Sequence, residues 1–298
     1  MAGRWLGLWA CVMWVGCASS PEEAPPTPDG GQGQTLVQQR PYRLVVPSSY
    51  RAEVPAPLVI LLHGFGSTGA EHDTYFGFSP LAEARGFLLA TPDGTLGVGN
   101  RRFWDATDAC CNFFAPPVDD VAYLRAVISD VQSRYAVDSR RIFVTGHSNG
   151  GFMSYRMGCE AADLVAGVAS LAGATWKDPA RCQPAAGVAV LQAHGTTDTT
   201  IRYEGGAVTE GAPPYPSARE TVERWAEKNR CTGALALTEE RLDLDTAVPG
   251  TETTVARTSA CGSGAAELWT LEGSSHVPQL GPEWAPRVYE FLLAHPKP

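Results

Sequence analysis

The sequence contains a serine in a pattern that suits nucleophilic catalysis. Gly146-His147-Ser148-Asn149-Gly150 matches G-x-S-x-G. The pattern directly follows an expected strand at 141–145 and precedes an expected helix at 152–159, which is the context it requires. A serine at such a turn lies in strained backbone, and the flanking glycines let neighbouring elements approach closely. We therefore predict that Ser148 is a nucleophile, rather than part of a glycine-rich helix entry.

A serine hydroxyl needs a general base, and the base needs a carboxylate to orient it. The G-x-S-x-G pattern is typical of a fold in which the chain order is serine, acid, histidine. His194, His276 and His295 follow Ser148 in the sequence. His276 comes after the last expected strand through a short polar loop, whereas His295 ends the terminal helix. We predict that His276 is the base.

The acid is predicted to be Asp198. His194 ends an expected strand at 188–193, and Gly195-Thr196-Thr197-Asp198 then indicates a tight turn with a carboxylate at its end. Two alternatives stay open: Asp198 only caps its own turn, or Asp178 is the acid, although no clear strand leads into it. His147 precedes the serine, so we interpret it as a packing or hydrogen-bonding residue.

Two backbone N–H groups are expected to stabilise the tetrahedral oxyanion that forms when a serine attacks a carbonyl group. One belongs to the residue after the nucleophile, Asn149, and the other to a loop that follows an early strand. Here that loop is His63-Gly64-Phe65-Gly66, after the apolar run at 58–62. We predict Phe65 as the second donor, with Gly64 as the alternative, and His63 as a structural residue of the loop.

Strands alternate with helices along the chain. The apolar patterns predict strands at 42–46, 58–62, 87–91, 141–145, 165–172, 188–193, 251–258 and 267–271, and helices at 118–135, 152–159, 217–229 and 282–294. This alternation favours an α/β fold with a mostly parallel central sheet and helices on both faces. Two long loop-like segments, 93–117 and 199–216, are expected over the carboxyl ends of the strands, where the site lies.

The N-terminal part is expected to lie outside the fold. Arg4 and the short apolar stretch after it predict a signal peptide over 1–17, of the lipoprotein type because Cys17 follows a small residue. An ordinary signal peptide cut nearby is the alternative. Residues 18–39 are rich in Pro, Gly, Glu and Gln, which predicts a disordered tether. Residues 40–298 then form one catalytic domain.

Composition limits the function classes. The chain has 298 residues with 44% hydrophobic and 18% charged residues, an ordinary globular balance. Its net charge of −9 argues against nucleic acid as a partner. We expect a monomer exported by a bacterium, with membrane contact only through a lipid anchor at Cys17.

Six cysteines follow the leader: Cys110, Cys111, Cys159, Cys182, Cys231 and Cys261. An even number in an exported chain predicts disulfides, and no paired C-x-x-C pattern favours the alternative of a zinc site. Of the 15 possible connectivities, we predict the pair Cys231–Cys261, which brackets a strand-rich stretch.

Several motifs together resemble one known group, the secreted α/β-hydrolase esterases comprising polyhydroxybutyrate depolymerases and feruloyl or acetylxylan esterases. They are Leu61-Leu62-His63-Gly64, Pro92-Asp93-Gly94, Trp104-Asp105, Cys110-Cys111, Val118-Asp119-Asp120-Val121, Gly146-His147-Ser148-Asn149-Gly150-Gly151, His194-Gly195-Thr196-Thr197-Asp198 and Glu272-Gly273-Ser274-Ser275-His276. The resemblance spans about residues 40–295. It implies a cofactor-free, metal-free serine esterase that acts on plant-wall phenolic or acetyl esters, or on short hydroxyacid polyesters.

The sequence gives fewer indications of which residues bind the substrate. In the group, Thr-Trp-Pro usually follows the catalytic histidine, whereas this chain has Val277-Pro278. Trp104 and Phe103 are predicted to form an aromatic wall for the substrate, with Tyr123 in the wall or in the core. Two competing functions stay open: a non-catalytic carbohydrate-binding surface lipoprotein, and a serine peptidase of the same fold.

Overall fold

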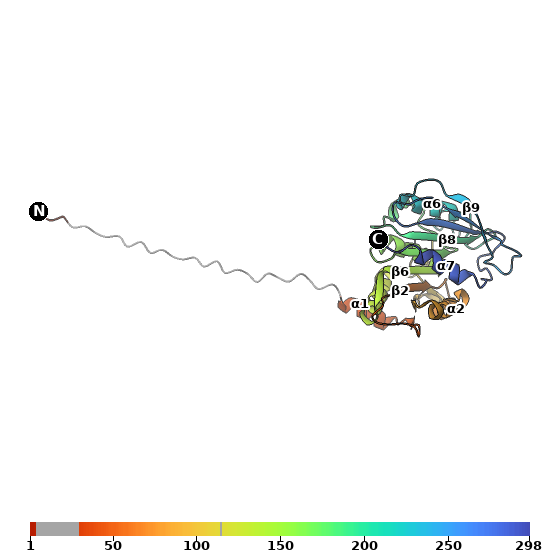
Figure 1. Ribbon diagram of the computed structural model, residues 1–298. Helices are drawn as coiled ribbons and strands as arrows, with labels where there is room; N and C mark the ends of the chain where they lie inside the picture. Colours follow the sequence, from red (N-terminus) through yellow and green to blue (C-terminus); the bar gives the residue numbers. More distant parts are fainter. Residues whose placement is uncertain (4–29, 114) are drawn as a thin grey trace.

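A twisted, mostly parallel sheet forms the centre of the domain (Figure 1). The computed structural model describes residues 1–3, 30–113 and 115–298. Among these residues, nine strands form one sheet in the order β1-β3-β2-β6-β7-β8-β11-β10-β9. The strands are β1 (Arg43–Val45), β2 (Ala56–Leu62), β3 (Leu88–Thr91), β6 (Val137–His147), β7 (Gly167–Leu171), β8 (Ala189–Gly195), β9 (Ala236–Leu242), β10 (Thr253–Arg257) and β11 (Ala266–Leu271).

The inner strands β3, β2, β6, β7, β8 and β11 are parallel to one another, and the strands at both edges are antiparallel. A short hairpin of β4 (Thr95–Leu96) and β5 (Arg102–Phe103) stands apart from the main sheet. Because parallel strands point the same way, the loops that follow β2, β6, β8 and β11 all leave at the same end of the sheet. The residues predicted for catalysis and for the oxyanion hole lie in or directly beside these four loops.

Helices cover both faces of the sheet. They are α1 (Gly30–Gln39), α2 (Gly69–Phe76), α3 (Phe78–Arg85), α4 (Asp120–Arg134), α5 (Asn149–Glu160), α6 (Ala218–Lys228) and α7 (Trp284–Leu293). Alternate side chains of β2 enter different cores: Leu58 and Ile60 pack with α4 and α5, whereas Val59 and Leu61 pack with α2, α3 and α7. A strand buried on both faces needs the continuous apolar run seen in the sequence. The predicted mostly parallel sheet with helices on both faces is confirmed.

The end of the expected tether is a helix. The signal peptide and most of the tether predicted over 18–39 lie outside the described residues, but residues 30–39 form α1. Leu36 and Val37 pack against the core beside α4. The Arg40 side chain that follows forms a 2.6 Å ion pair with the buried carboxylate of Asp120. For residues 30–39 the prediction of disorder is therefore wrong, because tertiary contacts outweigh a Gly- and Gln-rich composition.

Two helices between β2 and β3, α2 and α3, were not predicted. The start of α2 carries a capping box, in which Thr68 accepts the N–H of Glu71 and the Glu71 carboxylate accepts the N–H of Thr68. This S/T-x-x-E pattern is a helix-start signal. The apolar positions of α2 and α3 are too few for a clear helical period, which hides both helices from a periodicity search.

The six described cysteines form three disulfides, Cys110–Cys111, Cys159–Cys182 and Cys231–Cys261. The predicted pair Cys231–Cys261 is confirmed, and it joins the segment after α6 to the segment after β10. Because all six sulfurs are bonded to each other in pairs, these cysteines are not zinc ligands.

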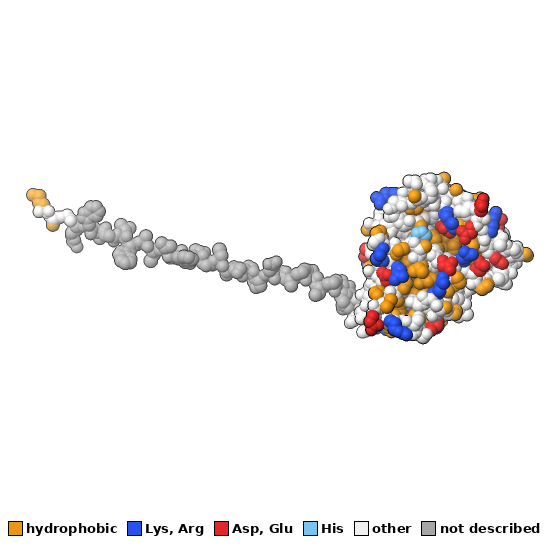
Figure 2. Space-filling model, viewed as in Figure 1, with side chains coloured by type: hydrophobic (Ala, Val, Ile, Leu, Met, Phe, Trp, Pro, Cys, Tyr) orange, Lys and Arg blue, Asp and Glu red, His pale blue; other side chains and the backbone are white. Residues whose placement is uncertain are grey.

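The surface in view carries charges of both signs around a central group of hydrophobic side chains (Figure 2). Lys and Arg side chains lie among Asp and Glu side chains rather than in a separate patch. Among the described residues, many surface charges are paired, for example Arg125 with Asp163 and Lys177 with Glu220. This face shows no basic stripe of the kind that nucleic-acid binding needs.

Candidate active site

Ser148 lies at a sharp turn between β6 and α5. Its backbone is in an unusual region, with φ 54° and ψ −120°, and its N–H donates to the carbonyl of Leu171 at 2.8 Å. A Cβ on Gly150 would lie 2.2 Å from the Leu62 carbonyl oxygen, and a Cβ on Gly146 would lie 2.6 Å from Gly150. Only glycine permits these approaches, so the two glycines let the turn sit against β2 while Ser148 points outward.

The structure brings together the three residues predicted for catalysis. Nε2 of His276 lies 3.0 Å from Oγ of Ser148, and Nδ1 of His276 lies 2.7 Å from Oδ2 of Asp198. The Asp198 side chain is fully buried, while that of His276 retains 16% exposure. The arrangement is a continuous hydrogen-bonded chain from a carboxylate through an imidazole to a hydroxyl. Such a chain can remove the hydroxyl proton and stabilise the imidazolium that results.

The Asp198 carboxylate is held as an anion by four donors. Its Oδ1 accepts the backbone N–H groups of Thr200 and Ile201, each at 2.8 Å. Its Oδ2 accepts from His276 and lies 3.3 Å from Nε2 of His194. Burial by itself would raise the pKa of Asp198, but the hydrogen bonds from His194 and His276 outweigh burial and hold the pKa well below its usual value.

The orientation of His194 follows from a buried chain of hydrogen bonds that sequence reasoning did not find. The Tyr155 hydroxyl donates to Oε1 of Gln192 at 2.7 Å, which leaves Nε2 of Gln192 to donate to Nδ1 of His194 at 3.1 Å. The proton of His194 is therefore on Nε2, facing Asp198 and the Ile201 carbonyl. His194 is thus not a second base but a donor to the acid.

The loop that carries His276 is fixed from two sides. Thr197, in the turn before Asp198, donates its side-chain and backbone hydrogens to the Ser274 carbonyl. On the other side, Nε2 of His147 donates to the His276 carbonyl at 2.8 Å, and the Tyr75 hydroxyl donates to the Pro278 carbonyl at 2.9 Å. The interpretation of His147 as a hydrogen-bonding residue is confirmed. These contacts place the imidazole ring between the other two groups.

His147 is deeply buried and stays neutral. Burial, together with the nearby His276, lowers its pKa to about 3. The ring of His72 stacks on it with ring centroids 5.3 Å apart, and the ring of Tyr75 packs against it edge-on. The two rings come from α2, so a helix that was not predicted supports the residue beside the nucleophile.

The loop after β2 passes directly beside Ser148. A Cβ on Gly64 would lie 3.6 Å from Cβ of Ser148 and 3.3 Å from the His147 ring. Phe65 is the next residue, and Asn149 opens α5 on the other side of the nucleophile. The backbone N–H groups predicted for the oxyanion therefore belong to two segments that meet at Ser148.

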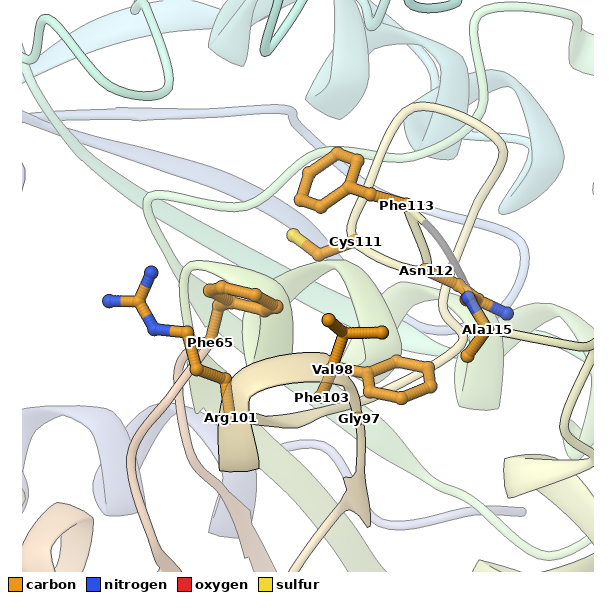
Figure 3. A pocket seen from close by; sticks show the side chains of 9 residues that line it. All are labelled: Phe65, Gly97, Val98, Arg101, Phe103, Cys111, Asn112, Phe113 and Ala115. Atoms are coloured by element: carbon orange, nitrogen blue, oxygen red, sulfur yellow. The ribbon is translucent and has the colours of Figure 1, made fainter.

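A mainly apolar cavity of about 320 Å³ adjoins this loop (Figure 3). Phe65, Val98 and Phe103 line it, together with Arg101 and with Phe113 from the opposite loop. Figure 3 shows the rings of Phe65, Phe103 and Phe113 around the same space. Phe103, predicted as part of a substrate wall, therefore lies in the wall of a cavity that Phe65 also lines.

Trp104 does not form a substrate wall. Its side chain has no exposed surface, and its ring packs in the core with those of His63 and Tyr123. The prediction failed because Trp104 directly follows Phe103, the last residue of β5, and neighbouring side chains along a strand point to opposite sides. Tyr123 is also a core residue, 1% exposed.

The described residues contain no group of three or more His, Cys, Asp or Glu side chains that could hold a metal ion. Nor does any helix within them have the length and apolar character needed to cross a membrane.

The chain is similar to known proteins both in sequence and in fold. The family described as "Putative esterase" matches residues 33–255. The feruloyl esterase B of Piromyces equi is 31% identical over 193 residues, which cover 63% of this chain and 35% of that protein. The poly(3-hydroxyalkanoate) depolymerase C of Paucimonas lemoignei is 26% identical over 254 residues, covering 80% of this chain and 58% of that protein. The chain thus spans about a third to somewhat over a half of the length of these relatives.

Among solved structures, the acetyl xylan esterase from Aspergillus awamori is similar to this chain with a TM-score of 0.59 and 16% identity. The match covers 84% of this chain and 92% of the Aspergillus chain. At this identity the match establishes the fold alone. The α/β-hydrolase fold predicted from the sequence is confirmed, as is the resemblance to the depolymerase and feruloyl esterase group.

Proposed function

The chain belongs to the esterase family that matches residues 33–255, and from this membership we propose that it is a serine carboxylic-ester hydrolase with Ser148, His276 and Asp198 as its catalytic residues. One observation carries the proposal. His276 is within hydrogen-bond distance of both other residues, 3.0 Å from Ser148 and 2.7 Å from Asp198. A fold alone can host many functions, so this chain of contacts matters more than the fold.

The mechanism follows from the proton positions. Asp198 accepts a hydrogen bond from the Nδ1–H of His276, so Nε2 is free to accept the hydroxyl proton of Ser148 as the oxygen attacks the ester carbonyl. The backbone N–H groups of Phe65 and Asn149 stabilise the oxyanion. The imidazolium then protonates the leaving alcohol, and a water molecule activated by His276 hydrolyses the acyl-enzyme.

We propose two substrate classes for this site: phenolic or acetyl esters of plant-wall polysaccharides, and short hydroxyacid polyesters. The names of the relatives, a feruloyl esterase and a poly(3-hydroxyalkanoate) depolymerase, support these classes. The aromatic cavity beside Phe65 supports an apolar or aromatic group next to the scissile bond, since its volume of about 320 Å³ suits a small acyl or alcohol group.

A substrate panel tests the proposal. Purified protein and the Ser148→Ala variant are compared on methyl ferulate, 3-hydroxybutyrate oligomers, acetylated xylan and a peptide amide. We expect hydrolysis of at least one ester by the parent and none above background by the variant. Turnover of the amide in preference to every ester would indicate a peptidase. Binding of xylan without any hydrolysis would indicate a carbohydrate-binding lipoprotein.

We also propose that the protein is an exported monomer whose membrane contact is limited to a lipid on Cys17. The three disulfides support export, because disulfides persist in oxidising compartments. Fractionation of bacteria that express the full chain tests the anchor. The parent is expected in the membrane fraction and Cys17→Ser in a soluble one, and equal distribution of both would contradict lipidation.

A further inference from the structure

Trp104 contacts both segments that supply the proposed oxyanion donors. Its indole Nε1–H donates to the His63 carbonyl at 3.0 Å, in the loop that leads to Phe65. Its backbone is bound by the Asn149 side chain, whose Oδ1 accepts the Trp104 N–H at 2.7 Å and whose Nδ2 donates to the Trp104 carbonyl at 2.9 Å. Both Trp104 and Asn149 are completely buried.

Trp104 is itself held in place from a third side. The next residue, Asp105, donates its backbone N–H to Oδ2 of Asp120 at 2.7 Å. The other oxygen of Asp120 is paired with Arg40, whose guanidinium lies 3.5 Å from the centroid of the Tyr123 ring. The side chain and backbone of Trp104 therefore have little freedom to move independently of the core.

His63 holds the loop that contains Phe65 through two further hydrogen bonds. Its Nε2 accepts the N–H of Gly94 at 2.8 Å, which leaves the proton on Nδ1 to donate to the Gly64 carbonyl at 2.7 Å. Burial lowers the pKa of His63, in agreement with a neutral ring. On the other side of Phe65, the N–H of Gly66 donates to the Arg102 carbonyl at 2.7 Å. Both neighbours of Phe65 are thus bonded in ways that fix the direction of its own N–H group.

From these contacts we infer that Trp104 and the Asn149 side chain are positioning residues for the oxyanion hole. They fix the loop of Phe65 and the first residue of α5 relative to each other through one shared partner. Two separate backbone donors must lie at fixed positions around one oxygen atom, and small displacements weaken both hydrogen bonds. The inference rests on the proposed ester hydrolysis and adds two side chains that position the oxyanion donors without touching the substrate.

The variant Trp104→Phe tests this inference, because it removes the indole N–H and retains an aromatic ring. Trp225→Phe is a matched control. Trp225 is also fully buried, and its Nε1 has no hydrogen-bond partner among the described residues. Both variants therefore lose the same part of the indole, but only the first loses a hydrogen bond. Thermal unfolding of both variants measures the shared packing cost.

The readouts are kcat and KM for p-nitrophenyl acetate, and the affinity for phenylboronic acid, which forms a tetrahedral anionic adduct with a catalytic serine. We expect Trp104→Phe to lower kcat about tenfold, less than the loss of a whole oxyanion donor. We expect KM to change less than about twofold and boronate affinity to fall by a similar factor to kcat/KM, since both depend on oxyanion stabilisation. Trp225→Phe is expected to match the parent in kcat and boronate affinity.

Equal kcat values and boronate affinities for Trp104→Phe and Trp225→Phe would overturn the inference. A parent protein that hydrolyses no ester would instead contradict the proposed function. Asn149→Ala provides a second variant, whose loss of boronate affinity is expected to equal or exceed that of Trp104→Phe. An unchanged affinity in a folded Asn149→Ala protein would also overturn the inference.

Discussion

Replacing Asp198 with asparagine is expected to lower kcat by about 10⁴-fold, the typical cost of this change in a serine triad. The structure fixes how an amide would sit. Oδ1 of Asp198 accepts two backbone N–H groups, from Thr200 and Ile201, at 2.8 Å each. The amide oxygen must take this position, because an NH₂ group there would face two donors. The NH₂ group then faces Nδ1 of His276.

An imidazole nitrogen that faces a donor must accept, so the proton of His276 moves to Nε2. That nitrogen lies 3.0 Å from Oγ of Ser148 and could no longer remove the hydroxyl proton. The variant also loses the negative charge that stabilises the imidazolium. A 10⁴-fold loss corresponds to about 5.5 kcal/mol of transition-state stabilisation.

The assay is steady-state hydrolysis of p-nitrophenyl acetate by the parent, Asp198→Asn and Ser148→Ala, with circular dichroism as a check on folding. The KM of the asparagine variant should remain close to that of the parent, since Asp198 is buried and does not contact substrate. A folded Asp198→Asn protein with kcat within tenfold of the parent would refute this reasoning about the tautomer.

Three further results are expected. Because burial lowers the pKa of His147 to about 3 from an ordinary value of 6.5, the unfolded chain takes up a proton there before the folded chain does. The contribution of neutral His147 to stability is complete above pH 6.5 and is lost as the pH falls toward 3. The free energy of unfolding is therefore expected to decrease by about 2 kcal/mol between pH 7 and pH 5. Urea unfolding checks this, and a His147→Gln variant with the same pH dependence as the parent would contradict it. Gly150→Ala places a Cβ 2.2 Å from the Leu62 carbonyl oxygen, so the midpoint temperature of thermal unfolding and kcat should both fall sharply. Values like those of the parent would argue against the tight turn. The double variant Cys159→Ser/Cys182→Ser removes a disulfide that joins residues 23 positions apart. The free energy of unfolding, measured by chemical denaturation, is expected to fall by about 3 kcal/mol. An unchanged denaturant concentration at the midpoint would contradict this.

The inner strands of the central sheet were predictable because they are buried on both faces, whereas the edge strand β9, which is largely exposed, was not predicted. Continuous apolar runs such as 58–62 are strong signals, and the alternation with amphipathic helices such as α4 gives the layer order. The helices α2 and α3 were missed because their apolar faces are small. α1 was missed because its stability comes from contacts with residues about 90 positions away, which composition does not reveal.

The three proposed catalytic residues could be selected from the sequence because each one follows a strand in a local motif. Their partners were not, since hydrogen bonds such as Tyr155 to Gln192 and Tyr75 to Pro278 join residues that are distant in the sequence. Trp104 shows most directly that the direction of a side chain is hard to predict from the sequence. An aromatic residue beside a site suggests substrate contact, but whether the ring faces the cavity or the core depends on the pleat of one short strand.

Labelling with a fluorophosphonate tests most directly whether the Ser148 hydroxyl is the activated nucleophile. Mass spectrometry of the intact parent should show one adduct per chain, located on the peptide that contains Ser148, and ester hydrolysis should fall in proportion to labelling. Ser148→Ala should acquire no adduct and hydrolyse no ester above background. Hydrolysis by Ser148→Ala at the parent rate, or an adduct on a different residue of an active parent, would contradict the account.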